Sequence, residues 1–225
     1  MKLKNNIKLL ITCDSGAAAG KTTAAKYLSK KFNLQLLTSG LLYRFVAFKI
    51  LTLHKKEINF SFIKKIAKNI NSKSLKNPKL YSPAVTEYTT KIAKIYKIRK
   101  ILRNYQNKFS QKKLAILEGR DMGILFPDAD IKFYFKCSLD TAAKRRFKEL
   151  KKINKNIKLK EVKNALKIRN RVDSTRKFSP LRIPKGAVIV DTTKINKKQM
   201  FTRISKVIED KLFLKYGRNY KARQK

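Results

Sequence analysis

Short apolar runs alternate along this chain with longer segments in which apolar residues recur at helical spacing. The runs are rich in Ile, Leu, Phe or Val, and they predict strands near 8–13, 34–38, 114–118, 131–136 and 187–191. The longer segments predict helices near 20–31, 41–53, 84–109, 139–151, 158–176 and 196–214. Buried strands separated by helices predict an α/β fold with a parallel five-stranded sheet and helices on both faces.

Two stretches depart from this alternation. Residues 55–83 carry Asn, Ser, Lys and two prolines, which is typical of an insertion rather than of sheet. Residues 215–225 are basic and are expected to form a frayed tail. Since the chain has 225 residues and no evident internal repeat, we expect a single domain over 1–225.

The chain is strongly basic, with 57 Lys and Arg against 14 Asp and Glu and a net charge of +43. Such an excess is compatible with nucleic acid, an anionic membrane surface or nucleotide substrates. Lysine is spread along the whole chain, however, which equally describes solvated helix faces. Non-specific attraction to polyanions is therefore expected, and the charge alone does not identify a partner.

The two cysteines, Cys13 and Cys137, lie in apolar strand-like segments, and the chain has a single histidine. This predicts buried free thiols in a reducing compartment and offers no Cys–His metal cluster. The apolar run Leu9 to Ile11 is too short for a signal core, and no stretch approaches membrane-spanning length. We therefore expect a cytoplasmic protein with no membrane partner.

The segment with the most specific chemistry is 7–23, IKLLITCDSGAAAGKTT. A strand, a loop of small residues and then Gly20, Lys21 and Thr22 at a helix start form the layout of a phosphate cradle. In such a loop the lysine reaches the β- and γ-phosphates and the next hydroxyl ligates Mg²⁺. The strict pattern has glycine where this chain has Ser15. Read alone, the segment also allows a lysine that merely opens a surface helix.

Acids and arginines are rarer than lysine, and their positions are informative. The acids at or just after strand ends, where a crevice ligand binds in such folds, are Asp14, Glu118, Asp121, Asp128 and Asp191. Arginine suits positions where a planar bidentate donor meets a phosphate. Several arginines near a phosphate loop indicate stabilisation of charge on a transferring phosphoryl group.

In chain order, the informative segments are ITCDSGAAAGKTTAAKYL, TSGLLYRFVA, VTEYTTKIAKIYKIRKIL, LEGRDMGILFPDADIKFYFKCS, KRRFKEL, IRNRVDSTRKFSPL and VIVDTT. Together they resemble the bacterial cytidylate kinases, nucleoside monophosphate kinases of the P-loop type. EGRDMG followed by FPDA, and R-x-x-x-D-x-x-R before SPL, are the most specific parts. The resemblance implies phosphorylation of CMP and dCMP to CDP and dCDP, with ATP and Mg²⁺ as cofactors and a monomeric enzyme. It also implies an acceptor-binding insertion, shortened here, within 39–110 and a mobile lid over 145–180.

The resemblance assigns roles to individual residues. The phosphate loop matches Ser15, Gly16, Ala17, Ala18, Ala19, Gly20, Lys21, Thr22 and Thr23. The acceptor phosphate matches Ser39, Arg44 and Arg120; the cytosine-reading set matches Thr90, Arg99, Asp121 and Arg176; and the sugar-binding pair matches Arg169 and Asp173. Lys21, Arg145, Arg146 and Arg169 are the expected catalytic residues, and Thr22 and Glu118, the latter through water, are the expected Mg²⁺ ligands.

Several positions depart from the family pattern. Ser15 and Ala18 replace loop glycines, Thr38 and Asn170 stand where aspartate is common, and Glu118 replaces an aspartate. These changes bear on rate and pyrimidine selectivity more than on the reaction.

Two other functions are compatible with parts of the sequence. One is a kinase of broader specificity for UMP, against which Asp121 argues because cytosine presents an amine where uracil presents an oxygen. The other is a basic RNA-associated or ribosome-associated P-loop NTPase. No Asn-Lys-x-Asp guanine motif and no RNA-binding signature is present.

Overall fold

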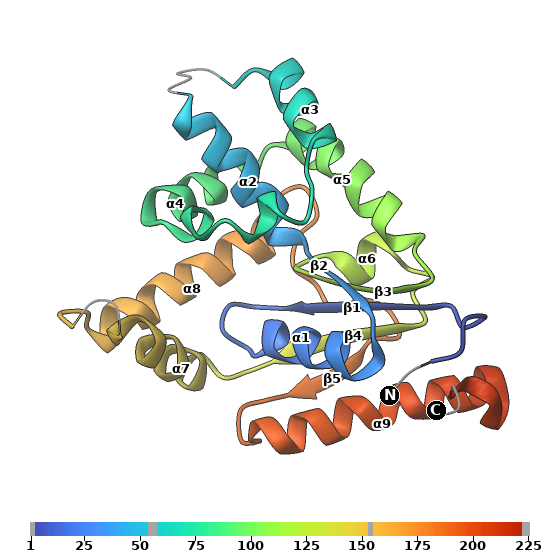
Figure 1. Cartoon of the computed structure of the whole chain (residues 1–225). Coiled ribbons are helices and arrows are strands. Elements are labelled where there is room, and N and C mark those ends of the chain that lie inside the picture. Colours follow the sequence, from blue (N-terminus) through green and yellow to red (C-terminus); the bar gives the residue numbers. More distant parts are fainter. Residues whose placement is uncertain (1–2, 54–57, 153–154, 222–225) are drawn as a thin grey trace. The chain divides into compact units, whose positions relative to one another are not determined.

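The predicted strands form one sheet in the order β2-β3-β1-β4-β5 in the computed structural model, which describes residues 3–53, 58–152 and 155–221 (Figure 1). The strands are β1 (Leu9–Ser15), β2 (Gln35–Thr38), β3 (Leu114–Gly119), β4 (Ile131–Lys136) and β5 (Val188–Asp191). β1 pairs in parallel with β3 and β4, and β4 with β5. The prediction of a parallel α/β sheet is therefore confirmed.

Most helices fall close to the predicted segments, and those at 60–68 and 122–125 lie outside them. The helices are α1 (Lys21–Phe32), α2 (Ser39–Thr52), α3 (Phe60–Lys68), α4 (Pro83–Ile92), α5 (Tyr96–Ser110), α6 (Met122–Leu125), α7 (Leu139–Lys151), α8 (Leu159–Thr175) and α9 (Lys197–Tyr216). Short 3₁₀ turns span Ser74–Lys76, Pro78–Tyr81 and Gly217–Tyr220. Within the described ranges, no helix is both long and apolar enough to cross a membrane.

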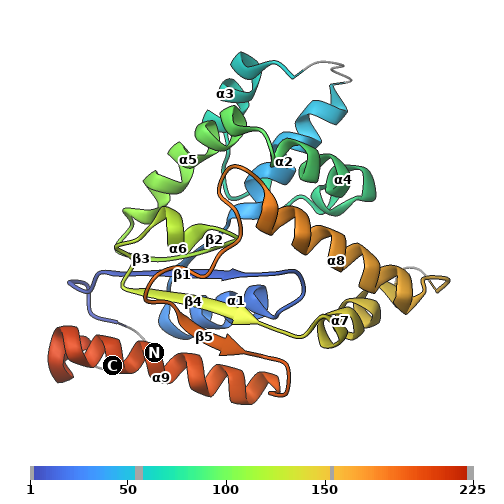
Figure 2. The same ribbon diagram turned by 180° about the vertical axis from the view of Figure 1, so that it is seen from behind.

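The chain divides into two compact units, one of Met1–Leu36 with Lys113–Lys225 and one of Leu37–Lys112. In the first unit, α1 and α9 pack one apolar stripe each against the sheet. The stripe of α9 recurs every four residues, at Met200, Ile204, Ile208 and Leu212, and joins the same buried cluster as Ile11 and Phe133. α7 and α8 lie side by side and form a smaller cluster with Ala17 (Figures 1 and 2).

The second unit is built from helices around α2. Leu42 and Val46 of α2, Ile92 at the end of α4 and Leu102 of α5 are fully buried. The expected single helix over 84–109 is broken here into α4 and α5, because Ile95 is extended. In one unbroken helix, Ile92 and Ile98 would face different sides, yet both are fully buried. The break lets both turn inward.

Two other expectations need correction. Residues 55–83 were expected to be an insertion rather than sheet, and the described part, 58–83, contains no strand, but the helix α3 at 60–68 was not predicted; there the Asn59 side chain accepts a hydrogen bond from the N–H of Phe62. The tail expected over 215–225 is not frayed from 215 to 221. Tyr220 is only 7% exposed, and its carbonyl accepts from the N–H of Lys4. Contact with the N-terminal segment orders these residues, and 222–225 lie outside the described ranges.

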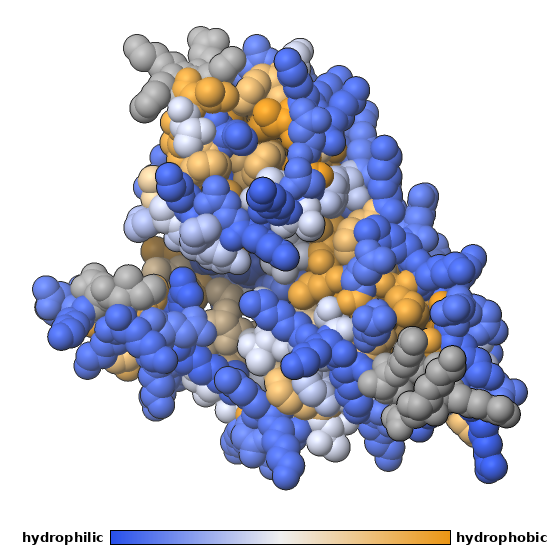
Figure 3. Space-filling view, viewed as in Figure 1, coloured by the Kyte–Doolittle hydropathy of each residue, from blue (hydrophilic) through white to orange (hydrophobic). Residues whose placement is uncertain are grey.

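The basic composition is visible at the surface. Hydrophilic residues cover most of the face in Figure 3, over both units. Apolar side chains show there as smaller separate areas. This distribution matches the expectation of solvated, lysine-rich helix faces.

Replacing Gly123 by alanine is expected to destabilise the protein by about 1–3 kcal/mol, the usual cost of overpacking. A Cβ at this position would lie 2.5 Å from Cγ of Pro184 and 3.2 Å from Oγ1 of Thr12. Urea unfolding checks this, with Gly40→Ala as the control because nothing lies within 4 Å of a Cβ at that exposed helical position. A Gly123→Ala protein as stable as the wild type would mean that the Pro184 segment yields without cost.

Candidate active site

The phosphate loop follows directly from the end of β1. Gly20 has φ 86° and caps the start of α1, and Ala18 has φ 56°, so both lie in the left-handed region. Glycine adopts this conformation freely, whereas alanine loses roughly 1 kcal/mol or more. The chain therefore makes this loop turn at some cost in backbone strain at Ala18, where the resemblance implies glycine.

At the start of α1, two side chains converge on one carboxylate of β3. The Nζ atom of Lys21 lies 3.1 Å from Oε1 of Glu118, and the hydroxyl of Thr22 donates to the same oxygen at 2.7 Å. Glu118 is 3% exposed. An ammonium, a hydroxyl and a carboxylate therefore meet at the carboxyl edge of the sheet.

Burial lowers the pKa of Lys21, and the nearby charges of Arg120 and Arg169 lower it further, while Glu118 raises it. Concentrated positive charge in a buried position favours binding of an anion. A polyphosphate beside Lys21 would restore its charged form. The electrostatics of this site therefore match a phosphate ligand.

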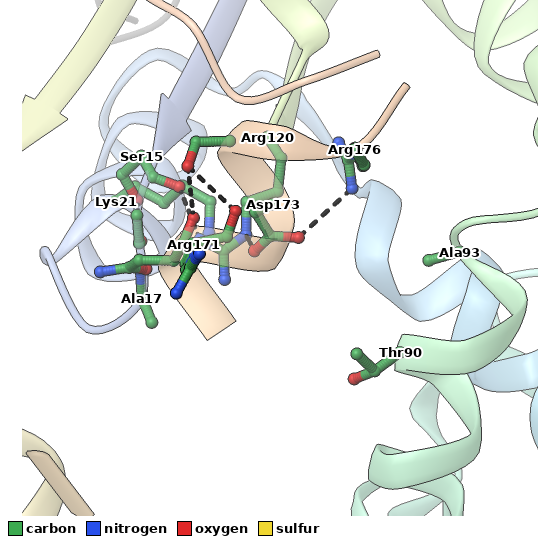
Figure 4. A network of polar contacts seen from close by, with 12 residues as sticks. Ser15, Ala17, Lys21, Thr90, Ala93, Arg120, Arg171, Asp173 and Arg176 are labelled. Atoms are coloured by element: carbon green, nitrogen blue, oxygen red, sulfur yellow. Dashed lines mark hydrogen bonds and ion pairs between the residues drawn. The ribbon is translucent and has the colours of Figure 1, made fainter. Parts of the chain in front are cut away.

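A second cluster links β1, β3 and α8 (Figure 4). Arg120 donates through Nη1 to the carbonyl of Ser15 at 2.9 Å, and its Nε lies 3.2 Å from Oδ2 of Asp173. The other carboxylate oxygen of Asp173 pairs with Nη1 of Arg176 at 3.3 Å. Burial lowers the pKa of Arg120 to about 10, and Asp173 opposes that shift. Three of the predicted acceptor-site residues are thus brought together.

The helix α8 contacts the phosphate loop through Asn170. Its Oδ1 accepts from the N–H of Ala17 at 2.9 Å, and a Cβ at Gly16 would lie 3.1 Å from that same oxygen. Sequence reasoning recorded Asn170 only as a departure and gave it no role. Arg169, the preceding residue, is exposed on α8, and its positive charge lowers the pKa of Lys21 and that of Arg120.

The two arginines of α7 differ in their surroundings. Arg145 donates to the hydroxyl of Thr192 at 3.0 Å and to its carbonyl at 2.6 Å. The Thr192 hydroxyl lies 3.1 Å from the carbonyl of Ala19, so Arg145 is tied to the phosphate loop through one residue. Arg146 pairs with Glu149 on the helix surface and is 44% exposed. Sequence reasoning missed Thr192, although the segment VIVDTT contained it.

The remaining predicted acceptor residues lie in the 37–112 unit. Arg44 donates to the carbonyl of Leu80 at 2.7 Å and to the hydroxyl of Thr86 at 2.9 Å. Ser39 is buried and accepts from Gln106, and Thr90 is exposed on α4.

Arg99 is 5% exposed and donates to the carbonyl of Ala93 at 3.1 Å. A guanidinium at this place caps the last turn of α4. Arg99 therefore has a structural contact at the end of α4, and its role in reading cytosine stays a prediction.

Asp121 lies just before α6 and is 4% exposed. It directly follows Arg120, so the loop after β3 carries a partly buried cation and a buried carboxylate in adjacent positions. In the described part of the chain, no group of three or more His, Cys, Asp or Glu residues is arranged to hold a metal ion. The hydroxyl of Thr22 and the carboxylate of Glu118 lie together beside the phosphate loop, and both carry oxygen atoms that can bind a metal ion.

Most of the chain is similar to known proteins. A family model described as Cytidylate kinase matches residues 11–210. A cytidylate kinase of Caldanaerobacter subterraneus subsp. tengcongensis is 31% identical over 214 residues, covering 90% of this chain and 96% of that protein. A cytidylate kinase of Fusobacterium nucleatum subsp. nucleatum is 33% identical over 215 residues, covering 89% of this chain and 97% of that protein. An uncharacterised protein of Eubacterium ventriosum shares the fold, with a TM-score of 0.52, 14% identity and coverage of 90% and 99%.

Proposed function

The chain belongs to the cytidylate kinase family and transfers a phosphoryl group from ATP to CMP, and we propose that the cluster around Lys21 is where the transfer takes place. The observation that carries this assignment is the shared Glu118 oxygen, which Lys21 and Thr22 both contact at the mouth of the phosphate loop. The loop N–H groups and the Lys21 ammonium would hold the β- and γ-phosphates of ATP.

The acceptor side is proposed from the second cluster and from the 37–112 unit. Arg120, with Arg44 and Ser39, would hold the phosphate of CMP, since guanidinium forks and a hydroxyl suit a dianion. Asp121 and Arg176, with Thr90 and Arg99, would read the cytosine edge. Asp173 would accept from a ribose hydroxyl, and its pairing with Arg120 and Arg176 keeps its carboxylate oriented.

The transfer itself needs no covalent intermediate. A phosphate oxygen of CMP attacks the γ-phosphorus of ATP in line, the bond from that phosphorus to the bridging oxygen of ADP breaks, and CDP forms. That oxygen is already ionised at neutral pH, so no general base is required. Lys21, with Arg145, Arg146 and Arg169 from a lid over 145–180, would disperse the charge of the transition state. Residues 153–154 of this lid lie outside the described ranges.

Mg²⁺ fits the residues at this site. The Thr22 hydroxyl and the Glu118 carboxylate lie 2.7 Å apart, and both are the oxygen ligands that Mg²⁺ prefers. We propose that these two residues hold the ion, Glu118 through water. When bound, Mg²⁺ neutralises charge on the phosphates of ATP.

We further propose that dCMP is also an acceptor and that the enzyme is a cytoplasmic monomer. The free thiols of Cys13 and Cys137 are in keeping with a reducing compartment. No specific nucleic-acid partner is proposed. The net charge of +43 is expected to give only a salt-sensitive, sequence-independent attraction to polyanions.

The proposal is tested by coupled ADP release with MgATP and, separately, CMP, dCMP, UMP, AMP and GMP. Turnover with CMP and dCMP, and little with the other three, is the expected result. Turnover with UMP at a similar rate would contradict the cytosine-reading role of Asp121. Slow ATP hydrolysis that is indifferent to every acceptor would contradict the kinase mechanism and favour the RNA-associated alternative.

A further inference from the structure

The carboxylate of Asp14 is buried at the end of β1, and the transfer mechanism leaves it without a role. Asp14 is fully buried, and each of its oxygens accepts one backbone N–H from the first turn of α6. The N–H of Met122 lies 2.9 Å from Oδ1, and that of Gly123 lies 2.7 Å from Oδ2. One carboxylate therefore holds two successive peptide groups, directly after Asp121.

The same end of β1 holds the loop at a third point. Ser15, next to Asp14, accepts from Arg120 through its carbonyl. Residues 14 and 15 thus contact residues 120, 122 and 123 with three hydrogen bonds. Asp121 is the residue that these bonds enclose.

The loop is closely packed on both sides of Asp121. A Cβ at Gly119 would lie 2.7 Å from Cγ of Met122, and one at Gly123 would lie 2.5 Å from Cγ of Pro184. Gly119 therefore fits against Met122, and Gly123 against Pro184, only with hydrogen in place of a side chain. Its orientation depends on the polar contacts that Asp14 makes.

Building on the proposed function, we infer that Asp14 is a positioning residue that orients Asp121 and Arg120 toward the CMP acceptor. β1 leads from Asp14 directly into the phosphate loop, so the same residue joins the acceptor-reading loop to the donor-binding loop. A carboxylate is required because both of its oxygens accept. An asparagine would offer one acceptor oxygen, and its NH₂ group would face the second N–H.

The surroundings of Asp14 make this contact sensitive to pH. Burial raises the pKa of Asp14 to about 7, the two backbone N–H groups lower it, Asp121 raises it and Lys21 lowers it. Tyr134 of β4 and the thiol of Cys13 are the other titratable groups that interact with it. Protonation turns one acceptor oxygen into a hydroxyl, so one of the two N–H contacts is lost as the pH falls through about 7.

The first test is Asp14→Asn in the full-length enzyme, with KM measured for each substrate. Loss of a hydrogen bond to a charged group predicts an increase of about ten- to a hundredfold in KM for CMP. Both hydrogen bonds of Asp14 go to Met122 and Gly123 and none to the phosphate loop, so KM for ATP should change far less and stay within about twofold. The control is Glu209→Gln on α9, which removes one carboxylate from a half-exposed pair with Lys31 and should leave both constants unchanged.

The second readout is the pH dependence of KM for CMP. In the wild type alone, this KM should rise by more than titration of the CMP phosphate accounts for, and Asp14→Asn serves as the reference. In the wild type, KM for CMP should rise as the pH falls from 8 to 6 and approach the KM of Asp14→Asn. In Asp14→Asn, KM rises only because the CMP phosphate titrates, with a pKa of about 6. Taking the ratio of the two proteins cancels the contribution of CMP.

An unchanged KM for CMP in Asp14→Asn, or a ratio that does not vary with pH, would overturn the positioning role. Failure of the wild type to phosphorylate CMP at any pH would instead overturn the proposed function. The two failures are therefore distinguishable. A wild type that is active on CMP, with a pH-dependent ratio, supports both.

Discussion

Lys21→Met should lower kcat by about 10²- to 10³-fold, the usual loss when one preorganised donor to the transition state is removed. Methionine keeps most of the length and the apolar stem of lysine, so packing at the start of α1 is preserved. It removes the ammonium that lies 3.1 Å from Glu118, and with it the mobile positive charge next to the phosphate loop. Steady-state kinetics with saturating MgATP and CMP measure this loss.

The control for this experiment is Lys26→Met, the same change at an exposed position on α1. It removes one of the many surface charges and should leave kcat within about twofold, since surface substitutions of this kind have small effects. Near-normal turnover in Lys21→Met would refute the assignment of the phosphate loop. A similar loss in both variants would point to the net charge rather than to the site.

Asp121→Asn should lower kcat/KM for CMP by roughly ten- to a hundredfold, which corresponds to one charge-assisted hydrogen bond. We expect the carboxylate to accept from the exocyclic amine of cytosine. Asparagine keeps an acceptor but loses the charge, and its NH₂ group can donate to the oxygen that uracil presents. The ratio of kcat/KM for CMP to kcat/KM for UMP should therefore fall, because the contact with cytosine weakens while a contact with uracil becomes possible.

Binding of ATP, measured by titration without an acceptor, separates a reading role from a structural one. It should be unchanged in Asp121→Asn, because Lys21 and the phosphate loop keep their contacts. An equal loss of ATP binding and CMP turnover would show that Asp121 supports the fold instead. The thermal unfolding midpoint of the variant, compared with that of Glu209→Gln, gives an independent check on stability.

The strands and most helices could be predicted from the sequence because their signals are local. A buried parallel strand is a short apolar run, and α1 and α9 each carry one apolar stripe along the helix. The loop between β1 and α1, with Lys21 at the helix start, was predictable for the same reason, since strand, loop and helix start are consecutive in the chain. The break before α5 and the helix α3 were missed, because they depend on which side chains the 37–112 unit buries.

The pattern of residues along the chain was thus enough to predict the α/β sheet, the loop between β1 and α1 and the family. Only the tertiary structure shows that Glu118 meets Lys21, that Asn170 contacts the phosphate loop and that Asp14 holds the turn after Asp121. Each of these pairs joins segments far apart in sequence. Their meeting depends on the register of β1 with β3, which sets Asp14 opposite Gly119, and on the packing of α8. Local preferences encode which element forms, whereas register and packing decide which side chains share a buried space.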